Sequence, residues 1–140
     1  MWDPHTENNI RKVEMVQPRA ARYVTNRHHN TSSVGDMLQQ LGWTSLQDRR
    51  EIQRLCMMYK IQNGLVAINQ DQYITRTARP SRHVHMLGYA IPQSSTEYHR
   101  QSYFPRTVRK WNTIPLEVTM ATTLQAFKRQ VVDLYAASPK

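Results

Sequence analysis

The chain has 140 residues, which suits one small domain with flanking arms, and its 39% apolar share allows only a modest core. Its formal net charge of +9 indicates a polyanionic partner, although a basic surface kept for solubility is the alternative. Cys56 is the only cysteine, which excludes an intrachain disulfide and a cysteine-based zinc site. Without a long apolar run we expect no membrane span, and we expect an intracellular protein of nucleus or cytoplasm.

The kind of positive charge supports the nucleic-acid interpretation. Fourteen of the nineteen basic residues are arginine and five are lysine. The planar guanidinium group matches phosphate oxygens and stacks on bases, whereas an ammonium group acts as a point charge. The composition therefore predicts RNA or DNA binding through backbone contacts, with little choice of sequence.

The first predicted element is an amphipathic helix from Thr6 to about Val24, with apolar residues at helical spacing. Pro18 lies inside this stretch and lacks a backbone N–H, so the helix should kink or split near Val16. The face away from the apolar stripe is basic. Arg11 and Arg22 lie on this face and Arg19 lies toward its side, and these three arginines are the candidate nucleic-acid contacts of the helix.

Two further helices follow after a polar stretch. Ser33 is placed to cap a short helix, and Gly42 stands where a left-handed C-terminal residue is wanted. Ser45 and Asp48 resemble a capping box for a longer helix that Gly64 stops. Because this third helix is apolar on two sides, we expect it to be the central helix of the fold.

Residues 76–110 carry seven basic side chains against one acid, Glu97. Within this stretch, 83–91 and 98–104 have the aromatic and β-branched content of weak strands, and 92–96 suggests a loop between them. A small hairpin is one interpretation, and a disordered basic linker is the other. The candidate nucleic-acid contacts of this region are Arg76, Arg79, Arg82, Arg100, Tyr103, Arg106, Arg109 and Lys110.

The aromatic residues in and near this basic region have two interpretations, base stacking and packing in the core. Tyr103 and Phe104 lie between basic residues, as aromatics that stack on single-stranded bases do, but Phe104 could equally pack on the core. Trp43 and Trp111 lie beside helix boundaries, where a lone tryptophan more often fills the core.

Two helices are predicted near the end of the chain. Pro105 is suited to open a short helix that runs through Trp111, and Pro115 ends that region. Thr123 caps a final helix. Its apolar stripe consists of Leu124, Phe127, Val131, Leu134 and Tyr135.

Together these elements predict a mainly α fold, a small bundle of three to four helices with a basic loop or weak β-hairpin insertion. We divide the chain into a helical region (1–64), a basic linker or hairpin (65–104) and a C-terminal helical region (105–140) that packs back on the first.

No constellation for catalysis, metal or cofactor binding stands out. His83 and His85 alternate as metal ligands on a strand could, but few further donors are available. Cys56 lies on the apolar face of a helix and should pack as a small hydrophobe. Asp48 and Glu51 have arginine neighbours, so ion pairing explains them better than acid–base catalysis.

The order of short motifs along the chain resembles a known family. Weak singly, they form an ordered series: Trp2-Asp-Pro4, Glu14-Met-Val-Gln17, Arg19-Ala-Ala-Arg-Tyr23, Leu41-Gly-Trp43, Arg49-Arg50, Met58-Tyr-Lys-Ile61, Asn63-Gly64, Ser102-Tyr-Phe-Pro-Arg-Thr-Val-Arg109, Trp111-Asn112, Ile114-Pro115 and Phe127-Lys128. This series is similar to the region downstream of the palm in LINE-type, jockey-like reverse transcriptases of non-LTR retrotransposons, and it covers nearly the whole chain. Pro18 departs from the basic residue usual in the family, and Ile114 from the usual leucine.

The resemblance implies a non-catalytic, C-terminal piece of an RNA-directed DNA polymerase. Its first 64 residues would correspond to an extension of the polymerase thumb, and the polymerase core of a related full-length element would be a partner. Polymerase chemistry in this family needs paired aspartates that hold Mg²⁺, and the sequence contains no Asp-Asp pair. Met1 follows the point where the family's preceding helix would end, as expected of a truncated copy.

Two rival interpretations remain. The helices could be purely structural, packing on an absent polymerase core with no activity of their own, in which case apolar faces should be exposed. Residues 33–62 could instead form a helix-turn-helix module, but the connection between its helices lacks a central glycine.

Overall fold

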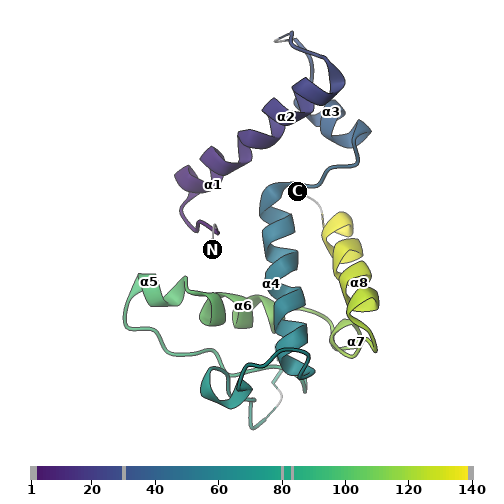
Figure 1. Ribbon diagram of the computed structural model, residues 1–140. Helices are drawn as coiled ribbons and strands as arrows, with labels where there is room; N and C mark the ends of the chain where they lie inside the picture. The colour runs from purple at the N-terminus through teal and green to yellow at the C-terminus, as the bar shows by residue number, and fades with distance from the viewer. Residues whose placement is uncertain (1–2, 30, 80, 83, 139–140) are drawn as a thin grey trace. The chain divides into compact units, whose positions relative to one another are not determined.

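The computed structural model describes residues 3–29, 31–79, 81–82 and 84–138, and it is mainly helical, as the sequence predicted (Figure 1). The elements in chain order are α1 (Glu7–Glu14), α2 (Val16–Thr25), α3 (Val34–Gln40), α4 (Leu46–Gln62), the short 3₁₀ helix η1 (Gln70–Gln72), α5 (Glu97–Arg100), α6 (Tyr103–Trp111), α7 (Leu116–Thr119) and α8 (Leu124–Ala137). They form two compact units, Met1–Glu51 and Ile52–Lys140, and the boundary falls within α4.

In the first unit the predicted N-terminal helix is split in two, as the position of Pro18 led us to expect. Helix α1 ends at Glu14, Met15 intervenes, and α2 begins at Val16. Pro18 has no N–H to donate to the carbonyl four residues earlier, so the ladder of hydrogen bonds is interrupted there. Thr6 is the N-cap residue of α1, but its side chain makes no capping hydrogen bond.

Helices α2 and α3 pack on each other around a very small core. Ala21 and Met37 are fully buried, and the Thr25 hydroxyl lies 3.3 Å from the Met37 sulfur. The predicted caps of α3 are confirmed. Ser33 Oγ accepts from the Asp36 N–H, and Gly42 adopts a left-handed conformation with a φ of 63°.

The N-terminus of α4 is capped twice. Ser45 Oγ accepts from the Asp48 N–H at 3.0 Å, as the sequence predicted. The Glu14 carboxylate also accepts from the backbone N–H groups of Leu46 and Gln47, at 3.2 and 2.6 Å. A carboxylate at this position satisfies two N–H groups that have no partner within the helix and interacts favourably with the helix dipole.

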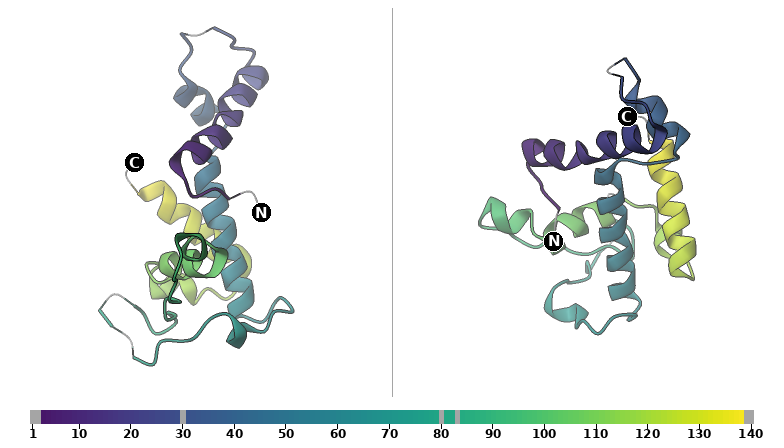
Figure 2. Two further views of the ribbon diagram at one scale, coloured as in Figure 1. Left: turned by 90° about the vertical axis from the view of Figure 1, so that its left-hand side faces the viewer. Right: turned by 45° about the horizontal axis from the view of Figure 1, so that its top comes forward.

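The second unit contains the main core, and α4 is its central helix, as predicted. Helix α8 runs alongside α4 in both views (Figures 1 and 2), and the Tyr59 and Phe127 rings stack between them at 4.7 Å. Trp111 from α6 meets Phe127 at 5.6 Å and is fully buried. The Tyr59 hydroxyl also donates to the Ala121 carbonyl at 2.6 Å. Burial of these large rings is the main stabilising term of the unit.

The segment between α4 and α5 is a loop. Gly64, with a φ of 66°, ends α4, and η1 is the one short helix in the described part of the loop. The strand pairing there is limited to two isolated antiparallel bridges, Arg76 with Tyr89 and Ser81 with Val84. Of the two alternatives for this region, the hairpin between 83–91 and 98–104 is wrong and the loop is confirmed for the described residues, which do not include residue 83.

Local capping explains why residues 98–104 are helical instead of extended. Thr96 Oγ1 accepts from the His99 N–H at 3.2 Å and so starts α5. Ser102 is the N-cap of α6, which begins at Tyr103, two residues earlier than predicted. Pro105 then falls in the first turn, where a missing N–H costs nothing. At the other end of the unit, Thr123 caps α8 as expected.

The loop is attached to the end of α6 by side-chain hydrogen bonds. Asn112, only 8% exposed, accepts from the Tyr89 N–H at 3.0 Å and donates to the Tyr89 carbonyl at 2.8 Å. The Trp111 indole N–H donates to the Leu87 carbonyl at 3.1 Å. Gly88 allows this close approach, because a Cβ there would lie only 3.1 Å from Asn112 Oδ1 and would collide with the Val84 side chain. These bonds hold residues 87–89 in place without a sheet.

Candidate nucleic-acid interface

Helix α6 carries the most ordered group of predicted basic residues. Successive residues turn by about 100° around a helix, so Arg106, Arg109 and Lys110 fall within one arc of about 100°. We call these three residues the α6 basic stripe. The opposite arc of α6 is buried against the core through Pro105, Thr107, Val108 and Trp111.

Burial of one side of α6 fixes where the basic stripe points. The three basic residues are half-buried, so part of each side chain lies along the protein surface. A helix held through a packed tryptophan presents its charges at defined spacing, which a mobile linker does not. The stripe is thus a preorganised cationic surface.

Helix α5 adds Arg100 to this region. The Arg109 guanidinium donates to the Arg100 carbonyl at 2.7 Å, which ties the end of α5 to α6. Arg100 itself is exposed and lies 3.7 Å from the Glu97 carboxylate. An exposed pair of this kind contributes little energy, so it does not prevent Arg100 from turning to a phosphate.

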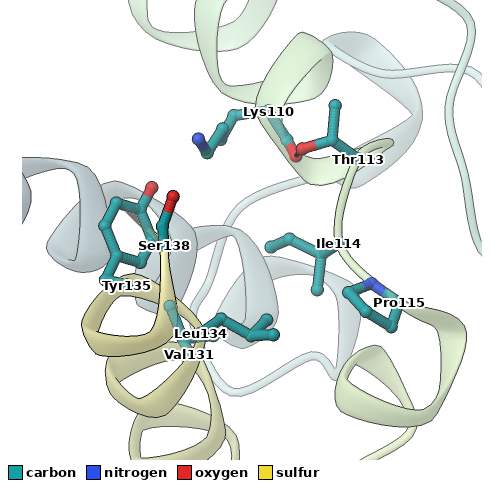
Figure 3. A pocket seen from close by; sticks show the side chains of 8 residues that line it. All are labelled: Lys110, Thr113, Ile114, Pro115, Val131, Leu134, Tyr135 and Ser138. Carbon is teal, nitrogen blue, oxygen red and sulfur yellow. Dashed lines mark hydrogen bonds between the residues drawn. The ribbon is translucent and has the colours of Figure 1, made fainter. Parts of the chain in front are cut away.

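Lys110 also borders a pocket between α6 and α8 (Figure 3). Its ammonium group lies 5.1 Å from the centroid of the Tyr135 ring, a cation–π arrangement. The pocket has a volume of about 290 Å³. Its lining residues are Lys110, Thr113, Ile114, Pro115, Val131, Leu134, Tyr135 and Ser138.

The three loop arginines are exposed. Arg76 lies with its guanidinium carbon 5.3 Å from the centroid of the Tyr89 ring, and through Tyr89 it is connected to Asn112 at the end of α6. Arg79 and Arg82 are both exposed in the loop. The structure links only Arg76 of this group to α6 through the contacts described above.

The candidate contacts of the first unit lie on α1 and α2. Arg11 is exposed and forms an i,i+4 ion pair with Glu7 at 3.4 Å. Arg19 is exposed and Arg22 half-buried. Since these residues belong to the other compact unit, they form a separate candidate patch.

The aromatic candidate Tyr103 is engaged by the protein. Its hydroxyl donates to the Arg54 carbonyl at 3.0 Å, and its ring meets Phe104 edge-on at 5.0 Å. Burial raises the pKa of Tyr103, so the hydroxyl stays protonated and keeps this bond. Phe104 in turn stacks on Tyr73 at 4.8 Å and packs against the core. Packing therefore accounts for both rings, which leaves the basic residues as the candidate contacts.

Other singled-out residues are structural. Trp111 is fully buried, as expected of a core residue, and Trp43 is half-buried. Cys56 is buried, as predicted, and burial raises the pKa of its thiol from 9.0. A raised pKa leaves little thiolate near neutral pH, which does not suit a nucleophile.

The histidine and acidic residues form no metal site within the described parts of the chain. No group of three or more His, Cys, Asp or Glu side chains comes together there. His85 is used locally, since its Nδ1 accepts from the Leu87 N–H at 3.1 Å and its Nε2 lies 3.4 Å from the Trp111 carbonyl. His83 lies outside the described residues.

The pocket was not foreseen from the sequence. Tyr135 was assigned only to the apolar stripe of the last helix, and Thr113 and Ser138 were not singled out. Lys110 and Tyr135 are 25 positions apart, and only the packing of α8 beside α6 brings them together. Helical spacing identifies residues on one helix face, but it contains no signal for two helices meeting at a pocket.

Comparison with known proteins adds no assignment. No protein-family model, curated protein or solved structure matches the chain. In the parts of the chain that the structure describes, no helix combines the length and apolar character needed to cross a bilayer.

Proposed function

We propose that this chain is a non-catalytic nucleic-acid-binding region equivalent to the post-palm part of a LINE-type reverse transcriptase. It would bind RNA or DNA through phosphate contacts, with low sequence specificity. The α6 basic stripe is the observation that supports this most directly, because it combines three cations with a rigid support. The loop arginines and Arg100 would extend the contact in the same unit.

The proposal assigns no polymerase activity to the chain. Two-metal phosphoryl transfer needs carboxylates held together at the reacting phosphate, and the five aspartates of this sequence are separate along the chain. A related polymerase core would supply that chemistry. The role proposed for this region is to hold template or target nucleic acid.

The test is a fluorescence-anisotropy titration of the purified chain with labelled single-stranded RNA and duplex DNA at several salt concentrations. Wild-type affinity should fall along a linear log–log salt plot, because binding releases counterions. The triple variant Arg106→Glu/Arg109→Glu/Lys110→Glu removes three contacts. Its slope on single strands should be smaller by about 2, and its affinity should be about tenfold weaker or worse.

A matched control distinguishes binding at the α6 basic stripe from binding that depends only on the net charge of the protein. Three exposed basic residues outside the proposed interface offer the same charge change: Lys12→Glu, Lys128→Glu and Arg129→Glu. Both triple variants lower the net charge from +9 to +3, because each substitution removes two units. If both lose the same affinity, the α6 basic stripe is not the interface. If the folded wild-type protein fails to bind at low salt, the proposed function is wrong.

A second candidate function is a purely structural role, in which the helices pack on a polymerase core. The observation that favours it is a group of exposed apolar side chains in the first unit: Met15, Val16, Tyr23 and Val24. Surfaces of this kind often mark contacts with another protein. A protein that binds a hydrophobic dye, self-associates and has no affinity for nucleic acid would support the structural role.

A further inference from the structure

The pocket beside the α6 basic stripe combines an apolar floor with a cation at its edge. Ile114, Val131 and Leu134 supply the apolar floor, and Tyr135 supplies an aromatic wall. Lys110 extends toward Tyr135 at one side of the opening, as Figure 3 shows. A ligand that fits must therefore have a flat or compact apolar body and a negative charge next to it.

Polar groups at the rim limit the ligand further. The Thr113 hydroxyl donates to the Lys110 carbonyl at 2.7 Å, so its lone pairs are directed to other donors. Ser138, at the C-terminal end of α8, is exposed and places a second hydroxyl at the rim. A ring that carries hydrogen-bonding groups on its edge suits this rim better than a plain hydrocarbon does.

The size of the pocket sets an upper limit. Its volume of about 290 Å³ is at the lower end of the range of roughly 300–1,000 Å³ for ligand pockets. One heterocyclic ring system would fit, whereas a stacked run of several would not. The charge of that ligand would lie at Lys110, which belongs to the α6 basic stripe as well as to the pocket.

We propose that this pocket receives one unstacked nucleobase of a single-stranded nucleic acid whose phosphates lie along the α6 basic stripe. The base inserts against Leu134 and Ile114, and the adjoining phosphate meets Lys110. Arg106, one helical turn before Lys110 on the same arc, meets a further phosphate of the strand. Base insertion adds affinity for single strands that a duplex, with its bases paired and stacked, does not gain. This inference rests on the proposed function.

The experiment compares two labelled probes of equal length, an oligothymidylate and an abasic deoxyribose-phosphate strand. They carry the same backbone charge and differ only in the bases. Wild type should bind the oligothymidylate about fivefold more tightly or better, because one stacked base contributes on that scale. Leu134→Trp and Ser138→Trp fill the pocket from residues that are not part of the buried core. Both should remove the preference and leave binding of the abasic strand and of duplex DNA unchanged.

Leu65→Trp is the matched control, because Leu65 is an exposed leucine far along the chain from the pocket residues. It should keep the wild-type preference, and circular dichroism should show all three variants folded. The inference is overturned if wild type shows no preference, or if both pocket variants retain it. If the abasic strand still binds with an affinity that falls linearly on a log–log salt plot, the proposed function is retained and only the inference fails. If neither probe binds to wild type, the proposed function and the inference fail together.

Discussion

Different interactions stabilise the interior of each of the two compact units of this chain. In the second unit, large rings and branched side chains are buried together, and every member of the buried core cluster lies there. Among the described residues of the first unit, only two apolar side chains are fully buried, Ala21 and Met37. The first unit relies instead on polar contacts. Gln17 donates to the Thr44 carbonyl at 2.6 Å, and Glu14 caps α4.

This difference bears on where a rigid binding surface can be built. Apolar burial scales with the area removed from water and keeps helices in fixed positions, whereas a polar contact replaces a hydrogen bond to water and has a smaller net contribution. Helix α6 belongs to the unit with the larger core, so its basic stripe is held in place. Arg11, Arg19 and Arg22 are presented by helices with far less burial beneath them. We therefore rank the α6 basic stripe above the first-unit patch.

The largest expected loss of stability comes from replacing Trp111 in the second unit, and Trp43 in the first unit offers the comparison. Trp111→Ala removes a fully buried ring and should lower the free energy of unfolding by about 3–5 kcal/mol. Trp43→Ala removes a half-buried ring and should cost about 1 kcal/mol. Denaturant unfolding followed by circular dichroism measures both. Equal losses would contradict the stated difference between the units.

A smaller effect is expected from the side chain that holds the loop to α6. Asn112→Ala leaves the buried N–H and carbonyl of Tyr89 without their partners, and should cost about 2–3 kcal/mol. Amide hydrogen exchange should show the loss of protection concentrated at Tyr89. Asn63→Ala is the control, because Asn63 is exposed and bonds only within its own helix end. If its cost matches that of Asn112→Ala, the loop is not anchored as described.

Much of the helical framework could be predicted because its signals are local. Ser33, Ser45 and Thr123 cap helices where the sequence placed them, and Pro18 splits the first helix. Gly42 and Gly64 end helices with positive φ angles, a conformation that glycine adopts without steric cost. Each of these features is determined by a few neighbouring residues.

The errors and omissions involve residues that act over a longer range. Residues 98–104 have strand-like composition, but the caps at Thr96 and Ser102 favour short helices there. Tyr89 pairs with Arg76 and with Asn112, contacts that no local pattern specifies. The candidate site likewise has one part that the sequence predicted and one part that it did not. Helical spacing grouped the α6 basic stripe, whereas the pocket depends on the packing of α8.

The smallest predicted effect concerns the polar support of the first unit. Glu14→Gln keeps an oxygen acceptor but loses the charge that faces the N-terminus of α4, and it weakens the 3.5 Å contact with Arg50. The expected cost is about 1 kcal/mol, a typical value for a capping interaction. Hydrogen exchange should show reduced protection of the Leu46 and Gln47 amides. The control is Glu7→Gln, whose exposed carboxylate pairs only with Arg11 on its own helix and should give no measurable change. If Glu14→Gln also leaves the amides of α4 fully protected, polar capping does not support this unit, and burial of Met37 and its neighbours must suffice.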